Sequence, residues 1–257
     1  MSFVKPKIIL PIVIIVIIVI GGVAYWYFFM RPVGPAMPEV IKIGAVLPLT
    51  PPGAYMSGKE MKMAMELAEE EINAAGGVLG RKIKIVFEDT AGTPEKGVAA
   101  MEKLIVKDKV IAVVGAFHSS VTLADMEVAN KYKIPYLTLA PWSNLITAKG
   151  YKYIFRLGLC NAIHFSNVGE LIHGLGFKNV VIMAENTDFG LGAAEDLKKT
   201  LEKYGIKVKI LTAELGTMDF TPMIGTIKGI NPDAIVNIFT GMSGYVLISQ
   251  LYDAGIA

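Results

Sequence analysis

A pair of serines next to a histidine is the first feature of this chain that could do chemistry. Residues 115–124 read GAFHSSVTLA and follow a short apolar run. A serine beside a histidine raises the question of nucleophilic catalysis. A hydroxyl and free backbone N–H groups at the start of a helix would instead suit an anion. The two interpretations make different demands on the surrounding residues.

The residues around the serines do not favour catalysis. A nucleophile elbow needs a glycine two positions before and two positions after the serine, whereas His118 and Val121 flank Ser119 and Ser120. His118 is a poor candidate base, because consecutive residues at a helix start point in different directions. The two other histidines lie in the second half of the chain, without an identifiable acid partner. We therefore expect no catalytic residues and no enzyme.

Metal and nucleotide sites are also not expected. The chain has three scattered histidines and a single cysteine, which offer no ligand spacing for a metal. Residues 190–194 read GLGAA after an apolar run, but the third position of the dinucleotide fingerprint would be Glu195. Its carboxylate would face a pyrophosphate at close range. We expect no cofactor.

The anion interpretation of the serines remains. Ser119 stands where a serine often caps a helix, and a cap that contributes about 1 kcal/mol would be a purely structural role. This helix start, however, follows the carboxyl end of a parallel strand, the edge at which open sheets bind ligands. Ser119 and Ser120 are therefore candidates for binding a carboxylate, and both interpretations stay open.

A second candidate stretch follows the next strand. Residues 138–144 read TLAPWSN. Pro141 forces an extended turn, which can direct the Ala140 carbonyl toward an amine. Trp142 could form a wall for an apolar side chain, or it could simply cover the sheet edge.

Alternating elements must position these residues. Apolar runs alternate with helical patterns, which predicts an α/β fold with open parallel sheets. In the first half we expect strands over 41–47, 83–88, 110–115, 135–139 and 153–156, and helices over 58–75, 94–107 and 119–132. The acidic run Glu69, Glu70, Glu71 lies off the apolar stripe of the first helix, and we expect it to face solvent.

The alternation resumes in the second half with fewer strands. We expect helices over 161–175, 189–204, 220–228 and 243–254, and strands over 180–184, 207–211 and 234–239. Three strands make a small sheet. We therefore expect the second lobe to be incomplete, with its C-terminal part absent from this sequence.

The N-terminal segment differs from the rest of the chain. Residues 8–30 carry no charge and could span a bilayer. Lys5 and Lys7 precede this run and Arg31 follows it, which predicts that the body lies outside the cytoplasm. We interpret residues 1–30 as a transmembrane anchor, with a signal peptide cut near residues 21–24 as the alternative. Residues 31–40 hold three prolines and form a linker.

Composition limits the remaining classes. The 257 residues are 53% hydrophobic and 19% charged, which is enough apolar material for one large or two modest globular units. The only cysteine, Cys160, cannot form an internal disulfide. The net charge of +2, with both signs interleaved, gives no footprint for nucleic acid.

Three stretches carry a resemblance to a known family. They read EINAAGGVLGRKIKIVFEDT (71–90), TPEKGVAAMEKLIVKDKVIAVVGAFHSSVTLA (93–124) and KIPYLTLAPWSNLITAKGYKYIFR (133–156). The chain from residue 41 onward closely resembles the leucine/isoleucine/valine-binding type of periplasmic binding protein. These are the extracytoplasmic receptors of branched-chain amino acid ABC transporters.

The resemblance implies a type I periplasmic binding protein with two doubly wound lobes and a ligand cleft between them. The lobes would comprise residues 41–157 and 158–257. The expected ligand is a branched-chain or other apolar amino acid, and the expected partner is the membrane permease of an ABC importer. A sensory ectodomain with the same fold is the alternative, and an enzyme ranks third.

The resemblance also assigns site residues. It implies that Ser119 binds the ligand carboxylate, and that the Ala140 carbonyl and a hydroxyl one residue past the proline bind the ammonium. Here that position is Trp142, so either Ser143 takes the role or the contact differs. Phe189 stands where the family often has a tyrosine, and it can stack but cannot donate a hydrogen bond. The acidic residue that usually receives the ammonium would lie beyond Ala257.

Overall fold

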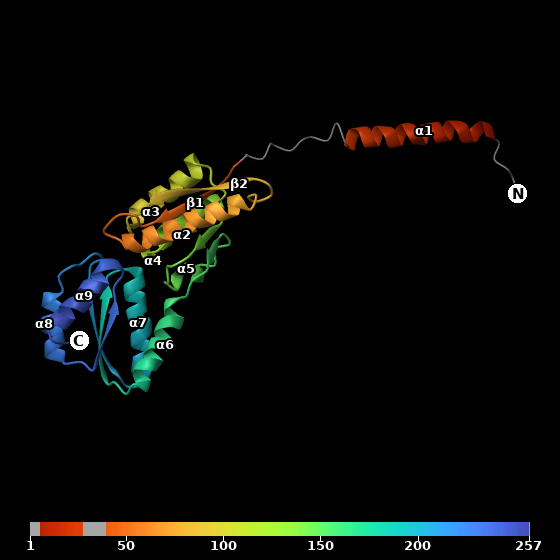
Figure 1. Cartoon of the computed structure of the whole chain (residues 1–257). Helices are drawn as coiled ribbons and strands as arrows, with labels where there is room; N and C mark the ends of the chain where they lie inside the picture. The colour runs from red at the N-terminus through yellow and green to blue at the C-terminus, as the bar shows by residue number, and fades with distance from the viewer. Residues whose placement is uncertain (1–5, 28–39, 257) are drawn as a thin grey trace. The chain divides into compact units, whose positions relative to one another are not determined.

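The computed structural model describes residues 6–27 and 40–256, which belong to two compact units, residues 1–39 and Val40–Ala257 (Figure 1). The first unit contains α1 (Pro6–Tyr25), whose described side chains begin at Val16. Among the residues that the structure describes, no helix is long and apolar enough to cross a bilayer. The rest of the expected anchor and linker, residues 1–5 and 28–39, lies outside the described residues.

A five-stranded parallel sheet forms the first half of the second unit. Its strands are β1 (Val40–Leu47), β2 (Lys82–Asp89), β3 (Ala112–Gly115), β4 (Tyr136–Thr138) and β5 (Ile154–Arg156). Their order is β2-β1-β3-β4-β5, and every neighbouring pair is parallel. The sequence-based expectation of an open parallel α/β sheet is therefore confirmed here.

The helices of this half pack on the sheet around one core. They are α2 (Tyr55–Ala74), α3 (Pro94–Glu102), α4 (Ser119–Tyr132) and α5 (Leu145–Ala148). The helix expected over 94–107 ends in a π-helical turn, Lys103–Lys107, in which the consecutive side chains of Leu104 and Ile105 are both buried. The sequence did not predict α5, because one helical turn is too short to show a periodic pattern.

A three-stranded parallel sheet forms the second half. Its elements are α6 (Asn161–Gly174), β6 (Asn179–Glu185), α7 (Asp188–Lys203), β7 (Lys207–Ala213), α8 (Thr221–Ile230), β8 (Ala234–Ile238) and α9 (Gly241–Asp253). The strand order is β7-β6-β8. Among the described residues this sheet has three strands, and the expectation of a missing C-terminal part stays a prediction.

The central strand β6 divides the second core into two layers. Val180, Ile182 and Ala184 belong to the cluster that α6 and α7 complete. Val181 and Met183 belong to the cluster that α8 and α9 complete. Because successive side chains of a strand point to opposite faces, a strand covered on both faces must be continuously apolar.

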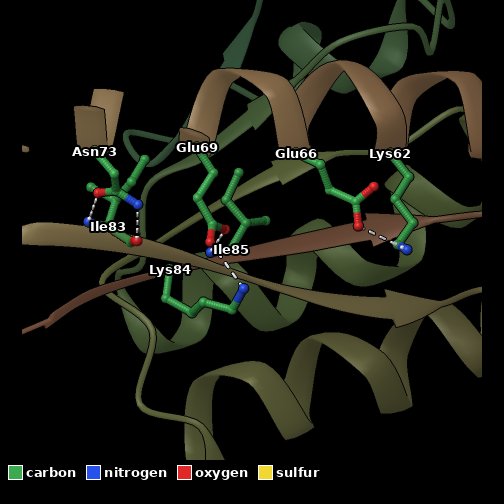
Figure 2. A network of polar contacts seen from close by, with 7 residues as sticks. All are labelled: Lys62, Glu66, Glu69, Asn73, Ile83, Lys84 and Ile85. Carbon is green, nitrogen blue, oxygen red and sulfur yellow. Dashed lines mark hydrogen bonds and ion pairs between the residues drawn. The ribbon is translucent and has the colours of Figure 1, made fainter. Parts of the chain in front are cut away.

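Side chains of α2 cover the free edge of the first sheet (Figure 2). β2 is an edge strand. The Asn73 amide accepts from the Ile83 N–H at 2.8 Å and donates to the Ile83 carbonyl at 2.9 Å. Glu69 accepts from the Ile85 N–H at 2.6 Å and pairs with Lys84 at 2.9 Å. These contacts satisfy edge groups that could otherwise pair with another strand.

Candidate functional site

A cavity of about 200 Å³ lies where loops of the two sheets meet. Loops that follow strands β3 and β4 line it from the first sheet, and residues at or after the ends of β6 and β8 line it from the second. The lining residues are Phe117, His118, Ala140, Trp142, Glu185, Phe189 and Thr240. The carboxyl edge of open parallel sheets is the place where ligands are expected to bind.

Three of the six predicted site residues lie in this lining: Ala140, Trp142 and Phe189. The rings of Trp142 and Phe189 meet edge to face, with centroids 6.0 Å apart. Both rings also pack against the core of the second sheet, so Trp142 reaches across from the first sheet. A ring wall that both halves build suits an apolar ligand group.

Ser119 does not line the cavity. Its hydroxyl oxygen is buried and accepts from the backbone N–H groups of Trp142 at 3.2 Å and Ser143 at 3.1 Å. His118, not Ser119, is the N-cap residue of α4, and no side chain caps this helix. In this structure the Ser119 hydroxyl fixes the loop that carries Trp142, and its own O–H proton remains available to donate.

The other two serines are also outside the lining. The Ser120 hydroxyl accepts from the Asp188 N–H at 3.0 Å and so links the two halves. The Ser143 hydroxyl accepts from the Leu145 N–H at 3.4 Å. The structure thus brings Ala140, Trp142 and Phe189 together and does not bring the serine hydroxyls to the same cavity. Ligand binding by the serines stays a prediction.

The Arg156 side chain braces the loop that carries Trp142. Its guanidinium donates to the carbonyls of Trp142 at 3.3 Å and Leu159 at 3.1 Å, and to the carbonyl of Ser143. Several donors in a rigid fork can hold several carbonyls at once. Hydrogen bonds with both Ser119 and Arg156 therefore hold this loop.

His118 is a lining residue that the sequence did not assign. Its Nε2 accepts from the Ala54 N–H at 3.2 Å, and its ring meets Phe117 edge to face at 5.1 Å. Burial lowers the pKa of His118 to about 4, because the buried ring is costly to charge. The imidazole is therefore neutral at pH 7, and it adds no positive charge to the cavity.

The other lining residues that sequence reasoning missed are Phe117, Glu185 and Thr240. Glu185 ends β6 and is 1% exposed. One carboxylate oxygen accepts from the Thr240 N–H at 2.8 Å and from its hydroxyl at 2.7 Å. The other accepts from the Thr187 hydroxyl at 2.9 Å. An acidic residue at the carboxyl end of an apolar strand was the available signal.

No group of metal-ligating side chains occurs within residues 6–27 and 40–256. The lining itself has one acidic residue, one histidine and no cysteine, a set too small for a closed metal site.

Two parallel α/β sheets with a cavity between their strand-end loops define a two-lobed α/β architecture. Residues 40–257 match the sequence model of a family described as periplasmic binding protein. The chain belongs to this family. The resemblance seen in the sequence is confirmed. As expected, the family is one of solute receptors and not of enzymes.

Individual relatives agree with this assignment. The chain is 33% identical over 193 residues to the leucine-, isoleucine-, valine-, threonine- and alanine-binding protein of Pseudomonas aeruginosa. The aligned region covers 74% of this chain and 51% of that protein. The branched-chain amino acid transporter substrate binding protein LivJ from Streptococcus pneumoniae, solved with isoleucine, has a TM-score of 0.76 at 27% identity over 85% of this chain and 62% of its own.

A third relative was solved with a different class of ligand. A solute binding protein of an ABC transporter from Rhodopseudomonas palustris, in complex with benzoate, has a TM-score of 0.78 at 25% identity over 84% of this chain and 60% of its own. This chain spans about half to three fifths of the length of the curated relatives that it matches.

Proposed function

We propose that this protein is the extracytoplasmic solute-binding receptor of an ABC importer, and that it holds a small apolar amino acid between its two halves. The observation that carries the proposal is the cavity lined from both sheets by the rings of Phe117, Trp142 and Phe189. Its volume of about 200 Å³ is below the roughly 300–1,000 Å³ of sites for drug-sized ligands. A single amino acid is of the appropriate size.

The carboxylate of such a ligand would bind near the start of α4. Backbone N–H groups in the first turn of a helix have no partner within the helix, and the helix dipole favours an anion there. The Ser119 hydroxyl still has a proton to donate, and Ser120 would exchange its contact with the Asp188 N–H for one with the ligand. Ser143 is the candidate for a hydroxyl contact to the ammonium.

The finer features of the receptor are part of the same proposal. Residues 8–30 would hold the body at the outer face of the membrane, since this run carries no charge and lysines precede it. Cleavage near residues 21–24 would leave the body in the same compartment. The closed form would be presented to a membrane permease. The unpaired edge of β8 would accept further strands of a complete second lobe.

A thermal-shift screen of the full chain, purified in detergent, tests the proposal. A ligand at 100 times its Kd stabilises the folded state by about 2.7 kcal/mol. We therefore expect leucine, isoleucine or valine to raise Tm by several degrees. If none of the amino acids raises Tm while circular dichroism shows a folded chain, the proposal is wrong.

A pair of variants assigns the effect to the cavity. Phe189→Ala removes one ring of the lining, and we expect it to abolish most of the ligand-induced shift. Phe155→Ala removes a ring on β5 that is 51% exposed and outside the lining, so it should keep the shift. Equal shifts in the two variants would place the binding elsewhere.

A further inference from the structure

Glu185 is an ionisable side chain in an otherwise apolar lining. It is 1% exposed, and its three hydrogen bonds come from neutral donors on Thr187 and Thr240. Among the ion pairs of the described part of the chain, none includes Glu185. A buried carboxylate without a cation is costly unless something neutralises its charge.

Nothing else in the lining supplies a positive charge. The lining has no lysine or arginine. His118 is neutral, because burial lowers its pKa to about 4. A ligand that enters the cavity therefore meets one acidic side chain, Glu185 at the end of β6, and no basic one. A carboxyl oxygen can accept two hydrogen bonds, and the oxygen that faces Thr187 accepts one in this structure.

The aromatic rings in the lining also favour a positively charged group on the ligand. Phe117, Trp142 and Phe189 surround the cavity together with Glu185. The face of an aromatic ring is negative and attracts a cation within about 6 Å of its centroid. Rings with one carboxylate and no basic side chain are the chemistry that recognises an ammonium group.

We propose that Glu185 is the receptor for a positively charged amino group of the ligand, and that this cavity therefore selects amines and amino acids over aromatic or aliphatic acids. The proposal rests on the proposed function, since it names a specificity-determining residue of the same cavity. A ring acid without an amine, such as the benzoate bound by one solved relative, would meet the Glu185 carboxylate without compensation.

Three ligands with the same branched apolar side chain test the proposal. Isothermal titration of the full chain with leucine, 4-methylpentanoate and 3-methylbutylamine compares the zwitterion with forms that lack the amine or the carboxylate. We expect 4-methylpentanoate to bind at least about 10-fold more weakly than leucine, as for the loss of one charge-assisted hydrogen bond. Equal affinity for leucine and 4-methylpentanoate would overturn the role of Glu185 and leave the proposed function standing.

A conservative variant supplies the second measurement. Glu185→Gln keeps oxygen and shape but removes the charge. We expect this variant to bind leucine about 10- to 100-fold more weakly, and to bind 4-methylpentanoate as tightly as the wild type or more tightly. Glu214→Gln removes an exposed carboxylate of the same half and should change neither. Equal loss for leucine and 4-methylpentanoate in Glu185→Gln would mean a purely structural role. If the wild type binds none of the three ligands, or if it binds benzoate, the result counts against both proposals.

Discussion

At the scale of single residues, His118 makes the stability of the protein depend on pH. Its pKa is about 4 in the folded protein, because burial disfavours the charged ring, against 6.5 for the unperturbed side chain. Between these values the unfolded chain binds a proton that the folded protein does not. Stability is therefore complete above about pH 6.5 and falls as the pH decreases toward 4.

The prediction is a loss of about 2 kcal/mol in the free energy of unfolding between pH 7 and pH 5 that is due to His118 alone. It is measured as the difference between wild type and His118→Gln in urea unfolding at both pH values. Glutamine can still accept from the Ala54 N–H but does not titrate. Identical pH slopes for the two proteins would contradict a buried neutral histidine.

The difference between the two proteins is needed because another buried group acts in the opposite direction. Asp125 is 0% exposed, and burial raises the pKa of its carboxyl. A carboxyl whose pKa is raised binds its proton at a higher pH in the folded protein than in the unfolded chain. Its contribution to stability therefore grows as the pH falls. The Asp125 effect is common to wild type and variant, and it cancels in the comparison.

At the scale of elements, α2 protects the edge of the first sheet through Asn73. Asn73→Ala would remove both hydrogen bonds to Ile83. We expect a loss of about 1–2 kcal/mol in the free energy of unfolding, because two partly buried backbone groups lose their partners. Urea unfolding measures the loss, and light scattering would reveal association through the freed edge.

Glu66→Ala is the matched control on the same helix. Glu66 pairs with Lys62 at 3.0 Å across one turn, and both side chains are exposed. Such pairs contribute no more than about 0.5 kcal/mol. If Glu66→Ala costs as much as Asn73→Ala, the contacts to β2 have no special role in stabilising the edge.

The elements also mark where sequence reasoning stops. Alternating apolar runs predicted each strand to within a few residues, because burial on both faces of a parallel strand leaves a continuous apolar segment. The acidic run of α2 was interpreted as facing solvent, and for Glu69 this was wrong. Its side chain is 16% exposed and binds the Ile85 N–H. A helical pattern shows which residues lie off the apolar stripe but not which strand edge lies beside them.

At the scale of the whole molecule, the site depends on contacts between distant segments. Ala140 and Trp142 could be predicted because they follow a strand that ends at the expected edge, whereas Phe189 was expected only from the family resemblance. The pair of Glu185 and Thr240 could not, since 55 positions separate its members. The partners of the Ser119 hydroxyl, 23 and 24 positions away, were equally hidden from the sequence.

The central claim is that the cavity beside Trp142 binds a small amine-bearing solute. The chain has two tryptophans, Trp26 and Trp142. The variant Trp26→Phe therefore leaves Trp142 as the single reporter, in contact with the ligand site. Titration of this variant with leucine should shift or quench the tryptophan emission in a saturable way, and 4-methylpentanoate should require a concentration at least about 10-fold higher. An emission that stays constant while calorimetry detects leucine binding would show that the ligand binds away from Trp142 and would contradict the account.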